Sequence, residues 1–308
     1  LGGVAKYAGI NSIENPANPA ETDRSVSGNS GFKSTLINSK LKIKENVKYQ
    51  INNGGETMRK VIVAGNWKMN KNFQEAESLM KELADYKKNH KTQCEVYIAP
   101  PSLYLTTAKT IFANNKVEVY SQDVSEYASG AYTGEISTGM LQSVGVNGSL
   151  VAHSERRQYH GETDISAGKK VKALLDAGLT PVYCNGETLD QRKAGKHLDI
   201  VKEQTETALF GLSAEEIQKV VIAYEPVWAI GTGETATPEQ AQEIHAHIRK
   251  LIAEKYGKAV ADEISILYGG SVKPENAKEI FSQPDIDGGL IGGAALKIED
   301  FSKIIEAF

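Results

Sequence analysis

Short runs of β-branched residues alternate with longer helical segments through most of this 308-residue chain. The runs are Lys60–Ala64, Glu95–Ala99, Val117–Tyr120, Ser149–Ala152, Thr180–Tyr183, Lys219–Ala223, Ile264–Leu267 and Gly288–Ile291. The segments with helical spacing include Phe73–Asn89, Ser102–Asn114, Asp164–Ala177, His197–Phe210, Pro238–Tyr256 and Lys273–Phe281. Strands that alternate with helices form a parallel sheet with right-handed crossovers.

Closure of this sheet into a barrel is favoured, because eight strand–helix units fill about 250 residues. An open sheet that binds a dinucleotide would carry Gly-x-Gly-x-x-Gly after its first strand. Residues 64–70 instead read Ala-Gly-Asn-Trp-Lys-Met-Asn. We therefore predict an α/β protein with a single (β/α)₈ barrel over residues 58–308.

Residues 1–57 differ in composition from the rest of the chain. They contain 21 Asn, Ser and Gly residues together, one Phe and no Trp. We expect a low-complexity, disordered extension, within which only Lys40–Lys44 alternates as a short strand would. A passive extension is favoured over a functional tail. Met58 is the expected natural start, because Gly54–Thr57 is compatible with translation of a purine-rich ribosome-binding site.

Composition excludes several classes of protein. The formal charge of −4 argues against a general nucleic-acid binder. No apolar run approaches the roughly 18 residues that span a bilayer, and the N-terminus lacks the apolar core of a secretory signal. Cys94 and Cys184 match no zinc or redox spacing. We expect reduced thiols in a cytoplasmic protein, with no metal, organic cofactor, membrane or nucleic acid as partner.

Polar motifs follow the predicted strands, and in a parallel barrel all these strand ends lie on one face. The motifs are Asn66–Asn70, His153–Arg157, Cys184–Glu187, Tyr224–Gly233, Tyr268–Ser271 and Leu290–Gly293. A lone Lys68 would usually be a solvated loop charge, and a lone His153 a hydrogen-bonded structural residue. Glycines at the ends of the last two strands let backbone N–H groups approach a phosphate.

Together and in this order, the motifs resemble those of the triosephosphate isomerases over residues 58–308. The run from Glu225 to Gly233 (Glu-Pro-Val-Trp-Ala-Ile-Gly-Thr-Gly) is the most specific of them. The resemblance implies a TIM barrel that interconverts dihydroxyacetone phosphate and D-glyceraldehyde 3-phosphate, a step of glycolysis and gluconeogenesis. Residues 1–57 have no counterpart in this pattern.

The resemblance also implies the roles of individual residues. Glu225 is the expected base, His153 a neutral imidazole that polarises the carbonyl, and Lys68 and Asn66 stabilise the enediolate. A helix that begins after His153 would disfavour protonation of its ring.

Residues around these groups have implied supporting roles. Glu155 and Cys184 would support the site from behind, although Glu155 could equally pair with Arg156 or Arg157 on the surface. The backbone of Gly231, Ser271, Gly292 and Gly293 would hold the phosphate.

Two loops complete the expected picture. Pro226–Thr235 reads as a lid that excludes water and prevents the enediolate from losing phosphate. The loop at residues 123–135 would insert into a second subunit near Asn66 and Lys68, which gives a homodimer. Otherwise it is an ordinary surface loop.

Several positions depart from the family pattern. Ala152 stands where the family usually has glycine, and a need for positive φ there would strain the chain and displace His153. Asn185 replaces an apolar residue, Tyr120-Ser121 replace a small apolar pair, and Ala295 replaces a serine that would cap a helix. The alternatives are therefore a barrel that binds a phosphometabolite or a partner protein without turnover, or another phosphate-binding barrel enzyme. The latter would not explain the Asn-Trp-Lys and Glu-Pro-Val-Trp motifs.

Overall fold

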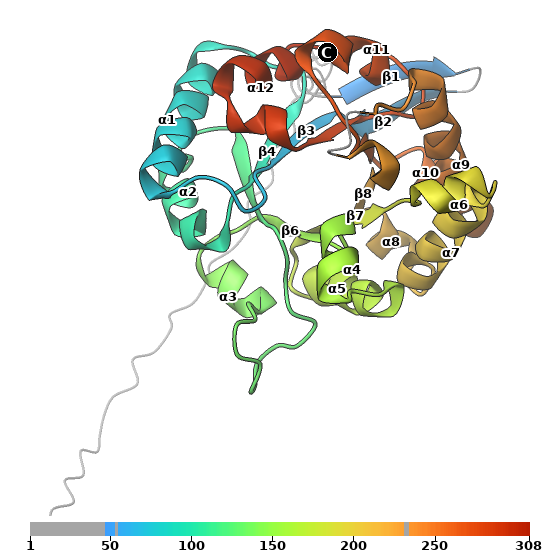
Figure 1. The fold of residues 1–308 in the computed structure, drawn as a ribbon, viewed down its shortest axis with the longest axis horizontal. Coiled ribbons are helices and arrows are strands. Elements are labelled where there is room, and N and C mark those ends of the chain that lie inside the picture. Colours follow the sequence, from blue (N-terminus) through green and yellow to red (C-terminus); the bar gives the residue numbers. More distant parts are fainter. Residues whose placement is uncertain (1–46, 53–54, 231–233) are drawn as a thin grey trace, which may run out of the picture. The chain divides into compact units, whose positions relative to one another are not determined.

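The computed structural model describes residues 47–52, 55–230 and 234–308. Within them, eight parallel strands close into a barrel in the order β10-β3-β4-β5-β6-β7-β8-β9 (Figure 1). The strands are β3 Ile62–Asn66, β4 Glu95–Ala99, β5 Val117–Ser121, β6 Gly148–Val151, β7 Thr180–Asn185, β8 Val221–Tyr224, β9 Ile266–Tyr268 and β10 Gly288–Ile291. Each overlaps a run predicted from the sequence, so the predicted barrel is confirmed.

Helices surround the strands as an outer ring (Figure 1). The larger ones are α1 Phe73–Asn89, α2 Leu105–Ile111, α4 Ser154–His160, α5 Asp164–Asp176, α7 His197–Leu209, α9 Pro238–Tyr256, α11 Pro274–Phe281 and α12 Ile298–Ile305. Shorter elements are η1 Ser102–Tyr104, α3 Thr138–Ser143, α6 Leu189–Lys193, α8 Ala214–Ile217, η2 Val227–Ala229, α10 Lys258–Ala261 and η3 Gly293–Leu296. The Thr237 hydroxyl accepts a hydrogen bond from Gln240 N–H and so caps α9, which begins at Pro238 as predicted.

The barrel interior is filled by side chains. Tyr120 stacks on Tyr97 there, with ring centroids 4.6 Å apart and an interplanar angle of 16°. Gly148 makes room for this pair, because a Cβ at position 148 would lie 2.5 Å from the Tyr120 ring. The bulk that Tyr120 adds is therefore accommodated by a glycine on the neighbouring strand.

An antiparallel pair of strands, β1 Val47–Asn52 and β2 Gly55–Lys60, precedes β3, with Val47 opposite Lys60. Part of the predicted extension thus forms a hairpin, while the Lys40–Lys44 run lies outside the described residues. The division of the chain near residue 57 stays a prediction. No helix of the described residues combines the length and apolar character needed to cross a membrane.

Candidate active site

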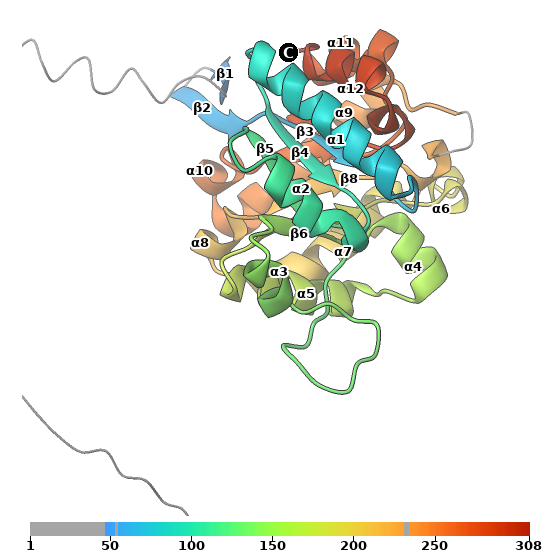
Figure 2. The same cartoon turned by 90° about the vertical axis from the view of Figure 1, so that its left-hand side faces the viewer.

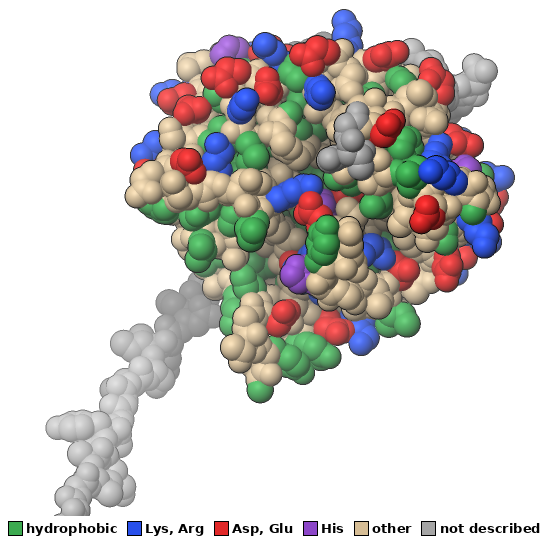
Figure 3. Space-filling model, viewed as in Figure 1, with side chains coloured by type: hydrophobic (Ala, Val, Ile, Leu, Met, Phe, Trp, Pro, Cys, Tyr) green, Lys and Arg blue, Asp and Glu red, His purple; other side chains and the backbone are tan. Residues whose placement is uncertain are grey.

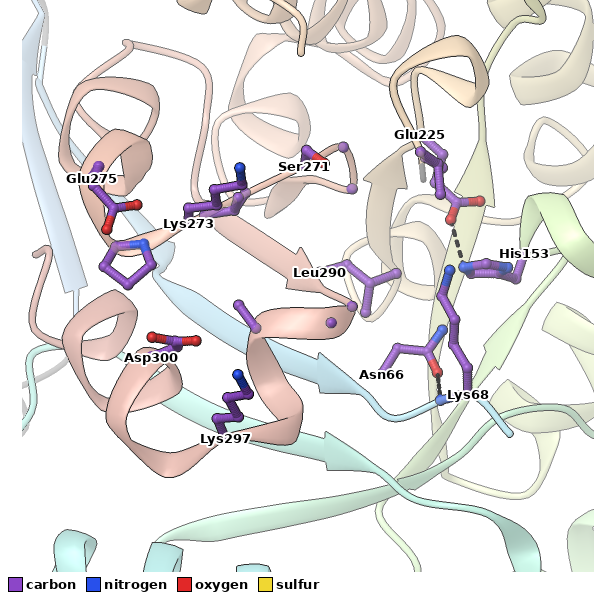
Figure 4. Close-up of a pocket in the computed structure, with 18 residues that line it drawn as sticks. Asn66, Lys68, His153, Glu225, Ser271, Lys273, Glu275, Leu290, Lys297 and Asp300 are labelled. Atoms are coloured by element: carbon purple, nitrogen blue, oxygen red, sulfur yellow. Dashed lines mark hydrogen bonds and ion pairs between the residues drawn. The ribbon is translucent and has the colours of Figure 1, made fainter. Parts of the chain in front are cut away.

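The ends of β3, β6 and β8 bring Lys68, His153 and Glu225 to one pocket of about 600 Å³ (Figure 4). Asn66 lines the same pocket, whereas Cys184 is buried in the barrel interior. Burial raises the pKa of the Cys184 thiol well above its ordinary value. Figure 3 views this end of the barrel, where acidic, basic and histidine side chains meet around a hollow.

Glu225 is buried, with 1% of its surface exposed. Its backbone N–H donates to Asn185 O at 2.7 Å, which joins the ends of β8 and β7. Glycines surround it: a Cβ at Gly186 would lie 1.8 Å from Glu225 O, and one at Gly269 would lie 2.9 Å from Glu225 Cγ. Gly186 and Gly269 belong to motifs visible in the sequence, but their close approach to Glu225 is seen only in the structure.

The Glu225 carboxylate has two partners. Oε1 lies 2.8 Å from His153 Nε2 (Figure 4). Oε2 accepts a hydrogen bond from Ser154 N–H at 2.8 Å. Ser154 is the first residue of α4, so the carboxylate sits at the positive end of this helix. In this arrangement the carboxylate is held by the groups on β6 and α4.

His153 is the N-cap of α4, and its Nδ1 accepts a hydrogen bond from Glu155 N–H at 3.2 Å. A protonated ring has no lone pair at Nδ1, so this contact requires a neutral imidazole with its proton on Nε2. Burial lowers the pKa of His153, but the carboxylates of Glu225 and, to a smaller extent, Glu155 raise it, and the pKa lies above its ordinary value. A ligand that separates Glu225 from His153 is therefore expected to lower this pKa.

Lys68 has a left-handed backbone, with φ of 52°. Its Nζ donates to Glu155 Oε1 at 2.6 Å, and its N–H donates to Asn66 Oδ1 at 3.0 Å. Gln122 Nε2 donates to Lys68 O at 2.8 Å, a contact that nothing in the sequence pattern indicates. Polar groups therefore hold the lysine at its backbone and at its ammonium.

The alternative partners considered for Glu155 are engaged elsewhere. Arg156 pairs with Asp123 and Glu162, and Arg157 pairs with Asp164. Glu155 contacts Lys68 instead.

The other side of the pocket is lined by Ser271, Gly292 and Gly293. A Cβ at Gly293 would meet nothing within 4 Å, so the protein itself leaves open space there. Gly231, the fourth residue predicted to hold phosphate, lies outside the described residues.

Comparison with known proteins agrees with this geometry. A model of the triosephosphate isomerase family matches residues 61–308. The chain belongs to the triosephosphate isomerase family. The triosephosphate isomerases of Bacteroides fragilis and Phocaeicola vulgatus are each 54% identical to it over 251 residues, which is 82% of this chain and 100% of either relative. That of Porphyromonas gingivalis is 52% identical over the same length.

The glutamate of the family's Cys-x-Gly-Glu motif, Glu187, anchors the start of the predicted lid. It is fully buried and accepts hydrogen bonds from Trp228 Nε1 at 2.8 Å and Tyr224 OH at 3.0 Å. Arg192 pairs with it at 3.0 Å. Within the predicted lid, Pro226–Thr235, residues 231–233 lie outside the described residues.

The departures from the family pattern have different structural consequences. Ala152 has φ of 60°, so the expected need for a left-handed backbone is confirmed at this position. Asn185 is buried and donates to Thr205 Oγ1 at 3.0 Å, while its Oδ1 has no partner among the described residues. The expected loss of a cap at Ala295 was wrong: Ala295 lies inside η3, and the residue before α12 is Lys297.

Proposed function

We propose that this protein interconverts dihydroxyacetone phosphate and D-glyceraldehyde 3-phosphate by proton transfer through an enediolate, with Glu225 as the base. Membership of the triosephosphate isomerase family makes the chain an isomerase of triose phosphates. The observation that carries the residue assignment is the contact of Glu225 with His153, 2.8 Å apart in a pocket that Lys68 also lines. A buried carboxylate beside a donor ring is the arrangement that proton abstraction next to a carbonyl requires.

The base must leave its present partners before it acts. Substrate oxygens that approach His153 Nε2 compete with Glu225 for the ring proton, and they free Oε1. The carboxylate then keeps only the Ser154 N–H contact and can turn toward the substrate carbon. His153, neutral because Nδ1 accepts from Glu155 N–H, donates its Nε2 proton to the substrate oxygen.

Lys68 supplies the positive charge that favours the enediolate. Its contact with Glu155 holds the ammonium beside the pocket, and 27% of the lysine side chain stays exposed for a ligand. The substrate phosphate is placed on the other side, against the backbone of Ser271, Gly292 and Gly293, with Gly231 completing the grip. The protein's net charge of −4 is compatible with this anionic substrate, because the phosphate would be bound by backbone N–H groups next to it rather than by the overall charge of the protein.

The segment Pro226–Thr235 acts as the lid. Its first part is held by the hydrogen bond from Trp228 Nε1 to Glu187. Closure excludes water and retains the enediolate until it is reprotonated. Shortening the segment is expected to raise the fraction of methylglyoxal among the products, and an unchanged product ratio contradicts the role.

A homodimer is the assembly that the surface favours. The loop at residues 123–135 projects from the barrel between β5 and α3 (Figure 2). It carries Tyr127 and Tyr132, stacked at 4.1 Å and each more than 40% exposed. Met69, next to Lys68, is 95% exposed. Exposed large apolar side chains mark interaction sites, and a second copy of the chain offers the surface around Lys68 and Met69 that the loop is expected to enter.

The decisive experiment for dimerisation is sedimentation velocity over a range of concentrations. Tyr132→Glu should shift the wild-type dimer toward monomer and lower activity at low enzyme concentration. A wild type that sediments as a monomer at micromolar concentration contradicts the assembly. Location in the cytoplasm stays a prediction; Cys94 and Cys184 are both unpaired and buried.

A coupled assay with D-glyceraldehyde 3-phosphate tests the function itself. We expect turnover without an added metal or cofactor. Absence of turnover, together with tight binding of a phosphorylated enediolate analogue, would favour the alternative of a phosphometabolite-binding barrel.

A further inference from the structure

The residue before His153 has an unusual backbone. Ala152 is fully buried and its φ of 60° lies in the left-handed region, which disfavours any residue with a Cβ. Among the described residues, Lys68 and Lys71 are the other non-glycine residues with positive φ. The conformation of Ala152 fixes the direction in which the chain leaves β6 and therefore the position of His153.

Two side chains hold the peptide groups of Ala152. Glu162 Oε1 accepts a hydrogen bond from Ala152 N–H at 3.1 Å, and Arg157 Nε donates to Ala152 O at 2.9 Å. Arg157 lies in α4, and Glu162 lies between α4 and α5. Arg157 in α4 and Glu162 just after α4 therefore both hydrogen-bond to Ala152, the residue that precedes His153.

Glu162 is itself fixed by a ring of charges. Its side chain is 3% exposed, with Oε2 at 3.1 Å from Arg156 Nε and Oε1 at 3.2 Å from Lys170 Nζ. Both cations also contact Asp123, at 2.8 Å and 2.7 Å. Buried carboxylates are stable only with such partners, so the Glu162 carboxylate is a rigid acceptor.

Arg157 is fixed equally well. Its Nη1 lies 2.5 Å from Asp164 Oδ1, and its Nη2 donates to Cys184 O at 3.0 Å. The second grip on Ala152 is therefore tied to the end of β7. Neither Glu162 nor Arg157 is among the residues that line the pocket.

We propose that Glu162, together with Arg157, is a positioning residue that holds Ala152 in its left-handed conformation and so keeps His153 Nε2 directed at the substrate. The role rests on the proposed function, because it acts through His153. Glycine adopts the same φ without penalty. The need for the grip therefore depends on the residue at position 152, and this dependence distinguishes positioning from mere stabilisation.

The test is a mutant cycle between positions 152 and 162. Glu162→Met and Glu162→Gln both remove the carboxylate from the charge ring, but only Gln keeps an oxygen that can accept from Ala152 N–H. With Ala152 present, we expect kcat of the Met variant to be about tenfold below that of the Gln variant, with similar KM. Without an acceptor for its N–H, Ala152 relaxes from the unfavourable left-handed conformation and His153 moves with it. In the Ala152→Gly background, the two variants should differ by about twofold or less.

Three outcomes would overturn the proposal: equal kcat for the Met and Gln variants, the same difference in both backgrounds, or a loss confined to KM. Asp123→Asn is the control for the group of ion pairs formed by Glu162, Arg156, Lys170 and Asp123. It leaves the Ala152 contacts intact, so it should lower the melting temperature and leave kcat nearly unchanged. If Glu162→Met does not fold, Arg157→Lys replaces it. That change removes the donor to Ala152 O, and Ala152→Gly should restore its kcat.

The proposal is separable from the proposed function. A wild type without turnover would refute the isomerase activity, but the His153 ring resonances still report its position. We expect these resonances to move in Glu162→Met and to return in the double variant with Ala152→Gly. Resonances that stay unchanged in Glu162→Met refute the positioning role.

Discussion

One side of the pocket is formed by polar side chains, and glycine and serine residues line the other. On the proposed catalytic side, Lys68, His153 and Glu225 reach the pocket as side chains, and each has a polar partner within 3.2 Å. On the proposed phosphate side, Ser271, Gly292 and Gly293 line the pocket, and space is left open at Gly293. The proposed catalytic side chains are held by one another and by neighbouring polar groups, and the proposed base exchanges its contact with His153 for the substrate when it acts, whereas the proposed phosphate side offers open space beside glycine.

This difference has an energetic side. Beside the proposed catalytic groups the backbone has positive φ at Lys68 and Ala152, and side chains from other parts of the chain, Gln122 and Glu162, hydrogen-bond to these two residues. Changes on the catalytic side should therefore act on kcat, and changes on the phosphate side on KM. The four predictions below test that division, from the largest effect to the smallest.

Glu225→Gln should have the largest effect. The amide keeps an oxygen for Ser154 N–H but cannot take a proton, so kcat should fall by roughly 10²–10⁴-fold, the usual contribution of a general base. The coupled assay measures this, with circular dichroism to check the fold. A loss below tenfold would remove Glu225 from its role as the base.

Lys68→Met should lower kcat by roughly 10²–10³-fold, because it removes a charge that stabilises the developing oxyanion. Lys71→Met is the matched control: Lys71 also has positive φ, at 73°, but does not line the pocket. Equal effects of the two variants would mean that the loss of a positive charge in this region, rather than the ammonium of Lys68 in the pocket, is what matters.

Gly293→Ala should raise KM about tenfold, since a methyl group there obstructs a charge-assisted contact with phosphate. The free energy of unfolding should stay unchanged, because the added Cβ meets nothing within 4 Å. Gly211→Ala, equally unobstructed and outside the pocket, is the control. A fall in kcat at constant KM would break the division between the two sides.

The smallest effect concerns the pKa of His153. Glu225 raises this pKa against burial, so Glu225→Gln should lower it, as NMR titration of the ring would show. The wild-type contact contributes stability that is complete below the ordinary pKa of about 6.5 and is lost as pH rises through the raised value. The variant should lack this dependence. An unchanged titration would mean that the two side chains are not in contact in solution.

Much of this protein could be predicted from its sequence, because strand periodicity and motif order are local. The eight strands were found as runs of β-branched residues, and α1 and α9 have the predicted bounds. The roles of Gly186, Gly269 and Gln122 could not be predicted in the same way. Each depends on an atom of a residue many positions away, such as Glu225 Cγ beside Gly269.

The sequence by itself determined the barrel, the family and the set Lys68, His153 and Glu225, because a parallel barrel gathers the carboxyl ends of its strands on one face. Only the tertiary structure decided how they are held. Ala152 has little intrinsic preference for φ of 60°, and it adopts this angle while Arg157 in α4 and Glu162 just after α4 hold its peptide groups. These side chains reach Ala152 only because α4 folds back beside the end of β6, and the residues around position 152 do not encode that arrangement by themselves.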